Sequence, residues 1–337
     1  MLLLLLLLPP LALALSPPSS LIVQNKGGGH GALGFHLARN LAALGHEVTI
    51  LQDAAYDSSA EPFCSYPSLP ASVSVVRFDA AAGELPALGE FANVVDNFSK
   101  DVGAPVSAKL LALKPERYVY VSSAGVYDPP ASHGGDDSGP LLESFDVFAK
   151  GQVLFERALL ASASVPSFSF RPQYIYGPNS AKHYLDYFFD RLLSGRPIPV
   201  PGSGEQLVSL TNAIDVASLL AAPLDRSVSL SKRGVYNCGT SNVVSYNELC
   251  ALCAAACGKK ADIKLFDPAV AGGKGAFPFR ENSFYVLPTK AEEELNWKGE
   301  ASIKSDMAAV WANYVERKGR GGGGDFAKDD VILAALA

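Results

Sequence analysis

The feature that most constrains this chain is a glycine-rich segment between a short apolar strand and a helix. The predicted elements are a strand at 21–24, the glycine segment at 26–34, a helix at 35–44 and a second strand at 46–51. Glycines in this place allow a tight turn, let the backbone approach a phosphate group closely and let the helix pack directly on the strand. The segment therefore predicts a βαβ unit whose helix N-terminus is suited to phosphate groups.

The spacing of these glycines fits a dinucleotide ligand, and the choice of cofactor, NAD and NADP included, stays open. An acidic side chain at the end of the second strand would hold a ribose. Asp53 has this position, or Gln52 if the strand is one residue shorter. Nucleotide binding and a glycine loop without a ligand are both open. The predicted cofactor-binding residues are Gly28, Gly31, Gly34, Asp53 and Ser122.

Apolar strand patterns continue along the chain, at 74–78, 93–96, 117–121, 168–172 and 234–239. They predict an α/β fold of the Rossmann type, a doubly wound parallel sheet with a smaller interleaved C-terminal lobe. From about residue 21 to 297 the chain resembles the extended short-chain dehydrogenase/reductase superfamily. We expect a targeting leader at 1–20, a Rossmann domain at 21–178 with returning segments near 206–239, the lobe at 179–318, and a glycine-rich linker and tail at 319–337.

The acid/base pair of that superfamily, a Tyr and a Lys four residues later, is missing from the expected segment. The lysine normally lowers the pKa of the phenol so that it can transfer a proton near neutral pH. Two alignments of this segment are open. One puts Asp146 at the Tyr position and Lys150 at the Lys position, and the other puts Phe148 and Gln152 there. The only Tyr-x-x-x-Lys, Tyr314 to Lys318, lies far beyond the predicted sheet. We therefore expect no hydride transfer on carbonyl or nucleotide-sugar substrates.

Several motifs make the resemblance more specific. His30 lies inside the glycine turn, and further matching segments are at 95–101, 122–127, 170–174, 199–206 and 329–336. With these segments the chain resembles the chloroplast stem-loop binding proteins, atypical members of the superfamily. The resemblance implies a plastid protein that binds RNA and associates with ribosomes, in some members with magnesium-dependent endoribonuclease activity. It also allows a homo- or hetero-oligomer with a related family member.

Magnesium-dependent cleavage needs carboxylates that converge on a hydrated metal ion. Asp96 and Asp101 lie near the end of one predicted strand, and Asp128 follows another, so the three are candidate ligands of Mg²⁺. Each of them is equally compatible with a role in capping a loop.

The charge distribution predicts that RNA binds to the C-terminal half. Residues 21–160 contain 9 Lys and Arg against 16 Asp and Glu, a net charge of −7, whereas residues 161–337 contain 19 against 18, a net charge of +1. Basic and aromatic residues alternate between 259 and 285, a mixture that suits looped RNA. The predicted RNA-binding residues are Lys259, Lys260, Lys274, Phe277, Phe279 and Arg280.

The first twenty residues form an apolar, proline-broken stretch that is too short to span a bilayer. It predicts a cleaved leader on the way to a plastid and no membrane association of the mature chain, with a misassigned start of translation as the alternative. Two other functions are open. An NAD(P)-dependent reductase or epimerase would need a substitute proton donor, for which Tyr127 is the candidate; a non-catalytic ribonucleoprotein scaffold would need none.

Overall fold

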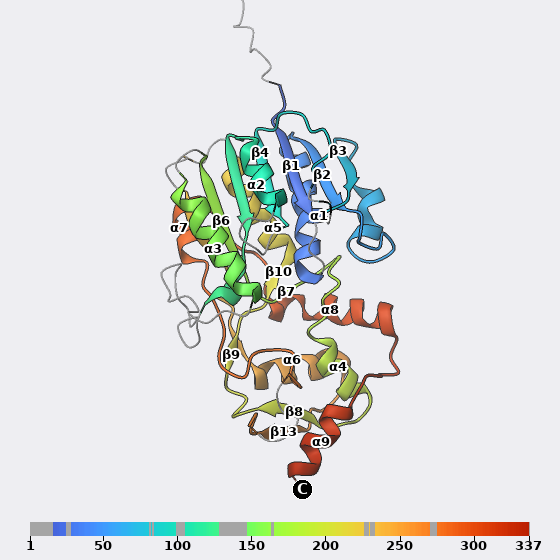
Figure 1. Cartoon of the computed structure of the whole chain (residues 1–337). Coiled ribbons are helices and arrows are strands. Elements are labelled where there is room, and N and C mark those ends of the chain that lie inside the picture. The colour runs from blue at the N-terminus through green and yellow to red at the C-terminus, as the bar shows by residue number, and fades with distance from the viewer. Residues whose placement is uncertain are drawn as a thin grey trace, which may run out of the picture.

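A computed structural model describes residues 16–24, 28–80, 82, 84–98, 105–127, 147–162, 165–225, 229, 233–269 and 275–336. A large sheet with its helices forms one part, and a smaller lobe that ends in the C-terminal helix lies beneath it (Figure 1). This arrangement confirms the α/β fold and the smaller lobe. None of the helices in the described ranges is long and apolar enough to cross a membrane.

The described part of the chain contains a sheet of seven parallel strands in the order β11-β6-β5-β4-β1-β2-β3. The strands are β1 (Ser19–Gln24), β2 (Glu47–Asp53), β3 (Val73–Phe78), β4 (Asn93–Asn97), β5 (Arg117–Val121), β6 (Ser167–Pro172) and β11 (Gly234–Cys238). The strand order reverses between β1 and β4. In open α/β sheets such a reversal creates a crevice at the carboxyl ends of the strands.

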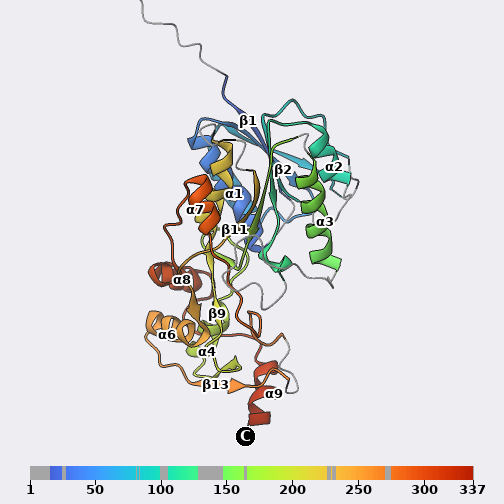
Figure 2. The same cartoon turned by 90° about the vertical axis from the view of Figure 1, so that its left-hand side faces the viewer.

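Helices cover both faces of this sheet (Figure 2). One face packs against α1 (Gly28–Ala43), α5 (Ala213–Ala221) and α7 (Thr289–Leu295), and the other against α2 (Pro105–Ala112) and α3 (Val147–Ala161). Because both faces are covered, β1, β4, β5 and β6 have almost no exposed side chains. This double burial explains why their sequences are apolar runs rather than alternating patterns.

The lobe has its own core, built largely from aromatic side chains. Its helices are α4 (Asp186–Leu193), α6 (Tyr246–Cys257) and α8 (Ile303–Lys318), and its strands are β8 (Ile198–Pro201), β9 (Leu207–Val208), β12 (Val244–Ser245) and β13 (Ile263–Phe266). The short strands β7 (Ile175–Tyr176) and β10 (Thr211–Asn212) pair where the chain passes between the two parts. The chain returns from the lobe to the sheet through α5 and β11, as the superfamily resemblance predicts.

The tail folds back onto the lobe as helix α9 (Ala327–Leu336). Asp329 is 1% exposed and accepts a hydrogen bond from Arg191 Nη2 at 2.7 Å. The guanidinium of Arg191 also lies over the rings of Tyr187 and Phe326, at 3.3 and 5.5 Å from their centroids. The last ten residues are therefore part of the lobe's packing.

Two expected boundaries differ from the structure. Helix α1 begins at Gly28 and not after the glycines, so the glycine segment supplies its first turns. Strand β1 begins at Ser19, and the buried Ser20 Oγ contacts His46 Nδ1 at 2.9 Å and accepts a hydrogen bond from Asn93 Nδ2 at 3.0 Å. A boundary after residue 20 would therefore cut the first strand of the sheet. Residues 1–15 of the expected leader lie outside the described ranges.

Replacing Gly34 by Ala should destabilise the Rossmann domain. A Cβ at this position would lie 2.3 Å from Gln24 Oε1, and Gln24 is fully buried, so the helix or the side chain must shift. Overpacking of this kind costs about 1–3 kcal/mol. Urea unfolding of Gly34→Ala measures the loss. Gly89→Ala is the control, because a Cβ there meets nothing within 4 Å. Equal stability of the two variants would contradict the close packing of α1 on β1.

The docked tail predicts different effects for two neighbouring aspartates. Asp329→Ala leaves the buried Arg191 without its partner and should lower the free energy of unfolding by roughly 3 kcal/mol. Asp330→Ala removes an ion pair with Arg196 in which the carboxylate is 64% exposed, and should cost less than about 1 kcal/mol. Thermal and urea unfolding compare them. Equal, small losses would mean that α9 is not held as described.

Candidate functional site

The crevice at the strand reversal is shaped by a contact between β1, β4 and the start of α1. Asn97, the last residue of β4, donates from Nδ2 to Gln24 Oε1 at 2.7 Å and to the carbonyl oxygen of His30 at 2.8 Å. The close approach of Gly34 to Gln24 fixes the helix on the strand. The glycines predicted as cofactor-binding residues thus lie at the N-terminal end of a helix that faces the crevice, where backbone N–H groups favour an anion.

The residues around this crevice fit a nucleotide. The buried Ser122 Oγ and Asn97 Oδ1 have no hydrogen-bond partner among the described residues, so a bound group could satisfy them. Strand β2 ends at Asp53, the residue predicted to hold a ribose, and Gln52 is the residue before it in the strand. Asp53 Oδ1 accepts from the N–H of Ala55 at 3.0 Å, which leaves Oδ2 for a ribose hydroxyl.

The expected place of the acid/base pair holds a structural ion pair instead. Gln152 is 2% exposed in α3, and one turn later the buried Glu156 pairs with Arg171 of β6 and accepts from Ser169 Oγ at 2.6 Å. Asp146 lies outside the described residues, as do the side chains of residues 148 and 150. Glu156 therefore joins α3 to the sheet.

The remaining Tyr-x-x-x-Lys belongs to the lobe. In α8, Tyr314 Oη donates to Asp190 Oδ1 at 2.6 Å and Lys318 Nζ donates to both oxygens of the same carboxylate at 2.8 Å. Asp190 is a buried residue of α4 in the lobe. Its two partners hold α8 on α4, so the spacing match is a structural coincidence.

Tyr127, the proposed substitute proton donor, is part of the same buried network as Arg171. Its side chain is 1% exposed, its hydroxyl donates to Asn237 Oδ1 at 2.8 Å, and the Arg171 guanidinium lies 4.8 Å from the centre of its ring. Burial raises the pKa of Tyr127, an effect that Arg171 only partly offsets. The phenol is thus held in the packing of the sheet, and its role as a substitute proton donor stays a prediction.

The three candidate magnesium ligands do not form a site in the described structure. Asp96 is fully buried and accepts hydrogen bonds from Ser107 Oγ at 2.7 Å and Tyr118 Oη at 2.8 Å, which join α2 and β5 to β4. It faces the interior and not the crevice. Asp101 and Asp128 lie outside the described residues. Within the described ranges, no three His, Cys, Asp or Glu side chains are grouped so that they could hold a metal ion.

The predicted RNA-binding residues separate into different environments. Phe277 and Phe279 are 7% and 6% exposed in the lobe core and pack on the ring of Tyr246, so their assignment to base stacking is wrong. Lys259 and Lys260 are exposed just after the end of α6. Lys274 lies outside the described residues.

Arg280 reaches from the lobe into the crevice. Its guanidinium lies 3.8 Å from the centre of the Phe284 ring, and Nη2 donates to the carbonyl oxygen of Gly125 at 3.3 Å. The hollow beside it has a volume of about 190 Å³. Its chemistry-bearing lining residues are His30, Ser123, Tyr174, Tyr184 and Arg280. An anion here would meet a cation, and a planar group would meet two aromatic rings.

The RNA-binding residues predicted from the sequence did not include Tyr174 and Tyr184. They stand in the segment that links the sheet to the lobe, with ring centroids 5.3 Å apart, and Tyr174 Oη accepts from the N–H of Arg280 at 3.0 Å. Because Arg280 is separated from them by about a hundred residues of chain, only the closure of the lobe against the sheet brings the three together. Tyr174 was visible only as part of a family motif and carried no role.

Solved structures with the same fold include two enzymes in complex with NAD. The dTDP-glucose 4,6-dehydratase of Bacillus anthracis in complex with NAD has a TM-score of 0.68 and 14% identity, covering 90% of this chain and 98% of that one. The UDP-glucose 4-epimerase of Thermus thermophilus in complex with NAD has a TM-score of 0.64 and 20% identity, covering 88% and 98%. At this identity the similarity shows the fold.

Sequence comparison narrows the relationship. The model of the NAD dependent epimerase/dehydratase family matches residues 104–239. The Chloroplast stem-loop binding protein of 41 kDa b of Arabidopsis thaliana is 32% identical over 324 residues, which cover 91% of this chain and 83% of the relative. On this similarity, and with the epimerase/dehydratase fold around a crevice that lacks the acid/base pair, the chain belongs to the chloroplast stem-loop binding protein family.

Proposed function

We propose that this protein is a plastid RNA-binding protein that binds looped RNA in and beside the crevice between the sheet and the lobe. The position of Arg280 carries the proposal, because its guanidinium and neighbouring aromatic rings line the hollow in the crevice together. The name of the Arabidopsis relative, which describes stem-loop binding in the chloroplast, supports the same interpretation.

The geometry suits an unpaired nucleotide better than a duplex. A hollow of about 190 Å³ is too small for a stem and large enough for one phosphate with part of its sugar or base. The ring of Tyr184 is already stacked on Phe279 at 5.6 Å and would offer a base its outer side. Arg280 would pair with the adjoining phosphate. Lys259 and Lys260 add positive charge elsewhere on the lobe, where a stem could follow.

The proposal extends to finer points that rest on the family resemblance. Ribosome association and magnesium-dependent cleavage of the bound stem-loop are part of it, with Asp101 and Asp128 as the two remaining candidate ligands. Entry into the plastid through a cleaved N-terminal leader is also part of it, with cleavage before Ser19, because β1 begins there.

A second candidate, nucleotide binding, is favoured by the unsatisfied Ser122 and Asn97 oxygens. Asp53, Ser122 and the glycines of α1 would hold NAD or NADP, and the cofactor would supply hydride chemistry to any reaction there. The chain's own contribution to such a reaction is limited, because neither open alignment places a Tyr and a Lys at the pair and Tyr127 donates its hydrogen bond to Asn237. A bound nucleotide would then order the crevice without turning over.

The RNA surface can be tested by removing its charge. The variant with Lys259, Lys260, Lys274 and Arg280 all replaced by Gln should bind stem-loop RNA more weakly whatever its sequence, because cation–phosphate contacts carry no base information. The slope of log affinity against log salt should fall by about 0.7 to 0.9 for each phosphate that the variant no longer neutralises. Filter binding or fluorescence anisotropy across a salt series measures both quantities.

The control carries the same kind of substitution on the acidic half. Lys109→Gln with Lys114→Gln should leave the affinity and its salt dependence unchanged. Tyr184→Leu should reduce the preference for looped over fully paired RNA, since stacking contributes about 1–3 kcal/mol per base. If the four-Gln variant folds normally and binds with unchanged affinity and slope, the lobe and crevice are not the RNA surface.

The missing acid/base pair predicts that cofactor-dependent turnover is undetectable. Nucleotide-sugar and simple carbonyl substrates should give no change in NADH absorbance with the wild-type protein, even if denaturation releases a bound nucleotide that mass spectrometry identifies. Detectable turnover that Tyr127→Phe abolishes would restore the oxidoreductase function. Turnover that survives Tyr127→Phe would also contradict the prediction and point to another proton donor.

A further inference from the structure

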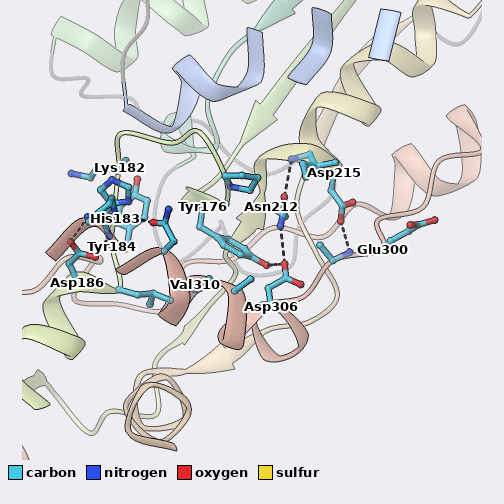
Figure 3. A pocket seen from close by; sticks show the side chains of 18 residues that line it. Tyr176, Lys182, His183, Tyr184, Asp186, Asn212, Asp215, Glu300, Asp306 and Val310 are labelled. Carbon is cyan, nitrogen blue, oxygen red and sulfur yellow. Dashed lines mark hydrogen bonds and ion pairs between the residues drawn. The ribbon is translucent and has the colours of Figure 1, made fainter. Parts of the chain in front are cut away.

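A second and larger cavity lies between the sheet and the lobe, on the side of α5 and α8. It has a volume of about 520 Å³, within the range typical of small-molecule sites (Figure 3). It opens between the first turn of α5, the segment before α4 and one face of α8. Of the residues that line the crevice beside Arg280, it shares only Tyr184. The proposed RNA site makes no use of this cavity.

Three carboxylates gather at one end of the cavity. Asp306 Oδ2 accepts from Tyr176 Oη at 2.7 Å and from Asn212 Nδ2 at 2.8 Å, and Asp215 Oδ2 accepts from the N–H of Ala301 at 2.9 Å. Glu300 stands beside them with an exposed side chain. None of Asp215, Glu300 and Asp306 forms an ion pair within the described part of the chain. This end therefore has a negative charge that the surrounding described residues do not balance.

The opposite end of the cavity has a positive charge. Lys182 lies 5.3 Å from the centre of the Tyr184 ring and forms no ion pair with any described residue. Beside it, the side chain of His183 forms no hydrogen bond with any described residue, and burial lowers its pKa. Arg317 is nearby but already pairs with Asp186 at 2.7 Å, so that charge is balanced. Lys182 and the ring of His183 are the groups free to meet an anion.

The wall between the two ends is mainly apolar. Ile214 and Val310 contribute aliphatic surface from α5 and α8, and the Tyr176 ring contributes an aromatic face. Ile214, in the first turn of α5, is 46% exposed. A ligand that spans the cavity would cover this surface.

We propose that this cavity binds a small zwitterion, a molecule with a protonated amine at one end, an acidic group at the other and an apolar body between them. The amine would lie among Asp215, Glu300 and Asp306, the acidic group would lie at Lys182 and His183, and the body would cover Ile214 and Val310. The cavity has negative charge at one end and positive charge at the other, and each end of a zwitterion would meet a group of opposite charge. This site is independent of RNA binding.

The charge requirement at each end can be tested with three matched compounds. The probes are 4-(aminomethyl)benzoate, which has both charges, benzylamine, which has only the amine, and 4-methylbenzoate, which has only the acid. We expect 4-(aminomethyl)benzoate to bind the full chain about tenfold more tightly than either of the others, since each charged contact adds to the affinity. Isothermal titration calorimetry or ligand-detected NMR measures the three affinities.

Two variants separate the two ends. Glu300→Gln should weaken the binding of 4-(aminomethyl)benzoate and benzylamine about three- to tenfold and leave that of 4-methylbenzoate unchanged. Lys182→Gln should weaken the binding of 4-(aminomethyl)benzoate and 4-methylbenzoate about three- to tenfold and leave that of benzylamine unchanged. Glu300 and Lys182 have exposed side chains, so both variants should fold. Glu316→Gln is the matched control, since Glu316 is exposed on α8 and does not line the cavity.

A blocking variant distinguishes this cavity from any other binding place. Ala309→Phe puts a ring into the cavity from an exposed position on α8 and should abolish the binding of all three probes without changing RNA affinity. Equal affinities for the three probes, no binding at millimolar concentration, or binding that survives Ala309→Phe would each overturn the proposal. Loss of RNA binding in the same variant would show that the two sites are not independent.

Discussion

The structure depends on the close packing of α1 against β1 at Gly34. Because this position has no Cβ, the helix can lie on the strand with Gln24 Oε1 directly beneath it, and Gln24 in turn holds Asn97 of β4. The carbonyl oxygen of His30 holds the same Asn97. One contact therefore sets the angle of the helix, the spacing of the two strands at which the order reverses, and the shape of the crevice.

Around this crevice the chain has the fold of NAD-binding epimerases and dehydratases, with a buried polar network beside it. In α3, Gln152 is buried, and one turn later Glu156 forms a buried ion pair with Arg171. Arg171 also covers Tyr127, which is hydrogen-bonded to Asn237 of β11. These side chains join α3, β6 and β11 to each other. Such a network gains stability only when all its members are satisfied, so it leaves little freedom to present a proton donor to a substrate.

The lobe completes both sites because its segments return to the sheet. Arg280 reaches the crevice from a segment anchored in the core by Phe279. On the other side, Asp306 of α8 and Glu300, just before that helix, line the second cavity with the first turn of α5. The tail contributes through Asp329, which holds Arg191 on the opposite end of α4. The crevice and the second cavity thus lie along one boundary between the sheet and the lobe.

The sequence alone determined the class of fold, the strands of the sheet and the absence of the acid/base pair, because these follow from local patterns: apolar runs, glycine spacing and residues a few positions apart. It also identified Asp53 at the end of β2 and Arg280 as residues of interest. Tertiary structure decided which polar and aromatic residues face a site. Asp96, Phe277 and Phe279 are residue types common in functional sites, but here they are buried. Tyr184 and Arg280 line the same hollow although about a hundred residues of chain separate them. Burial and distant contacts depend on how the lobe closes on the sheet, and no local pattern in the sequence encodes that closure.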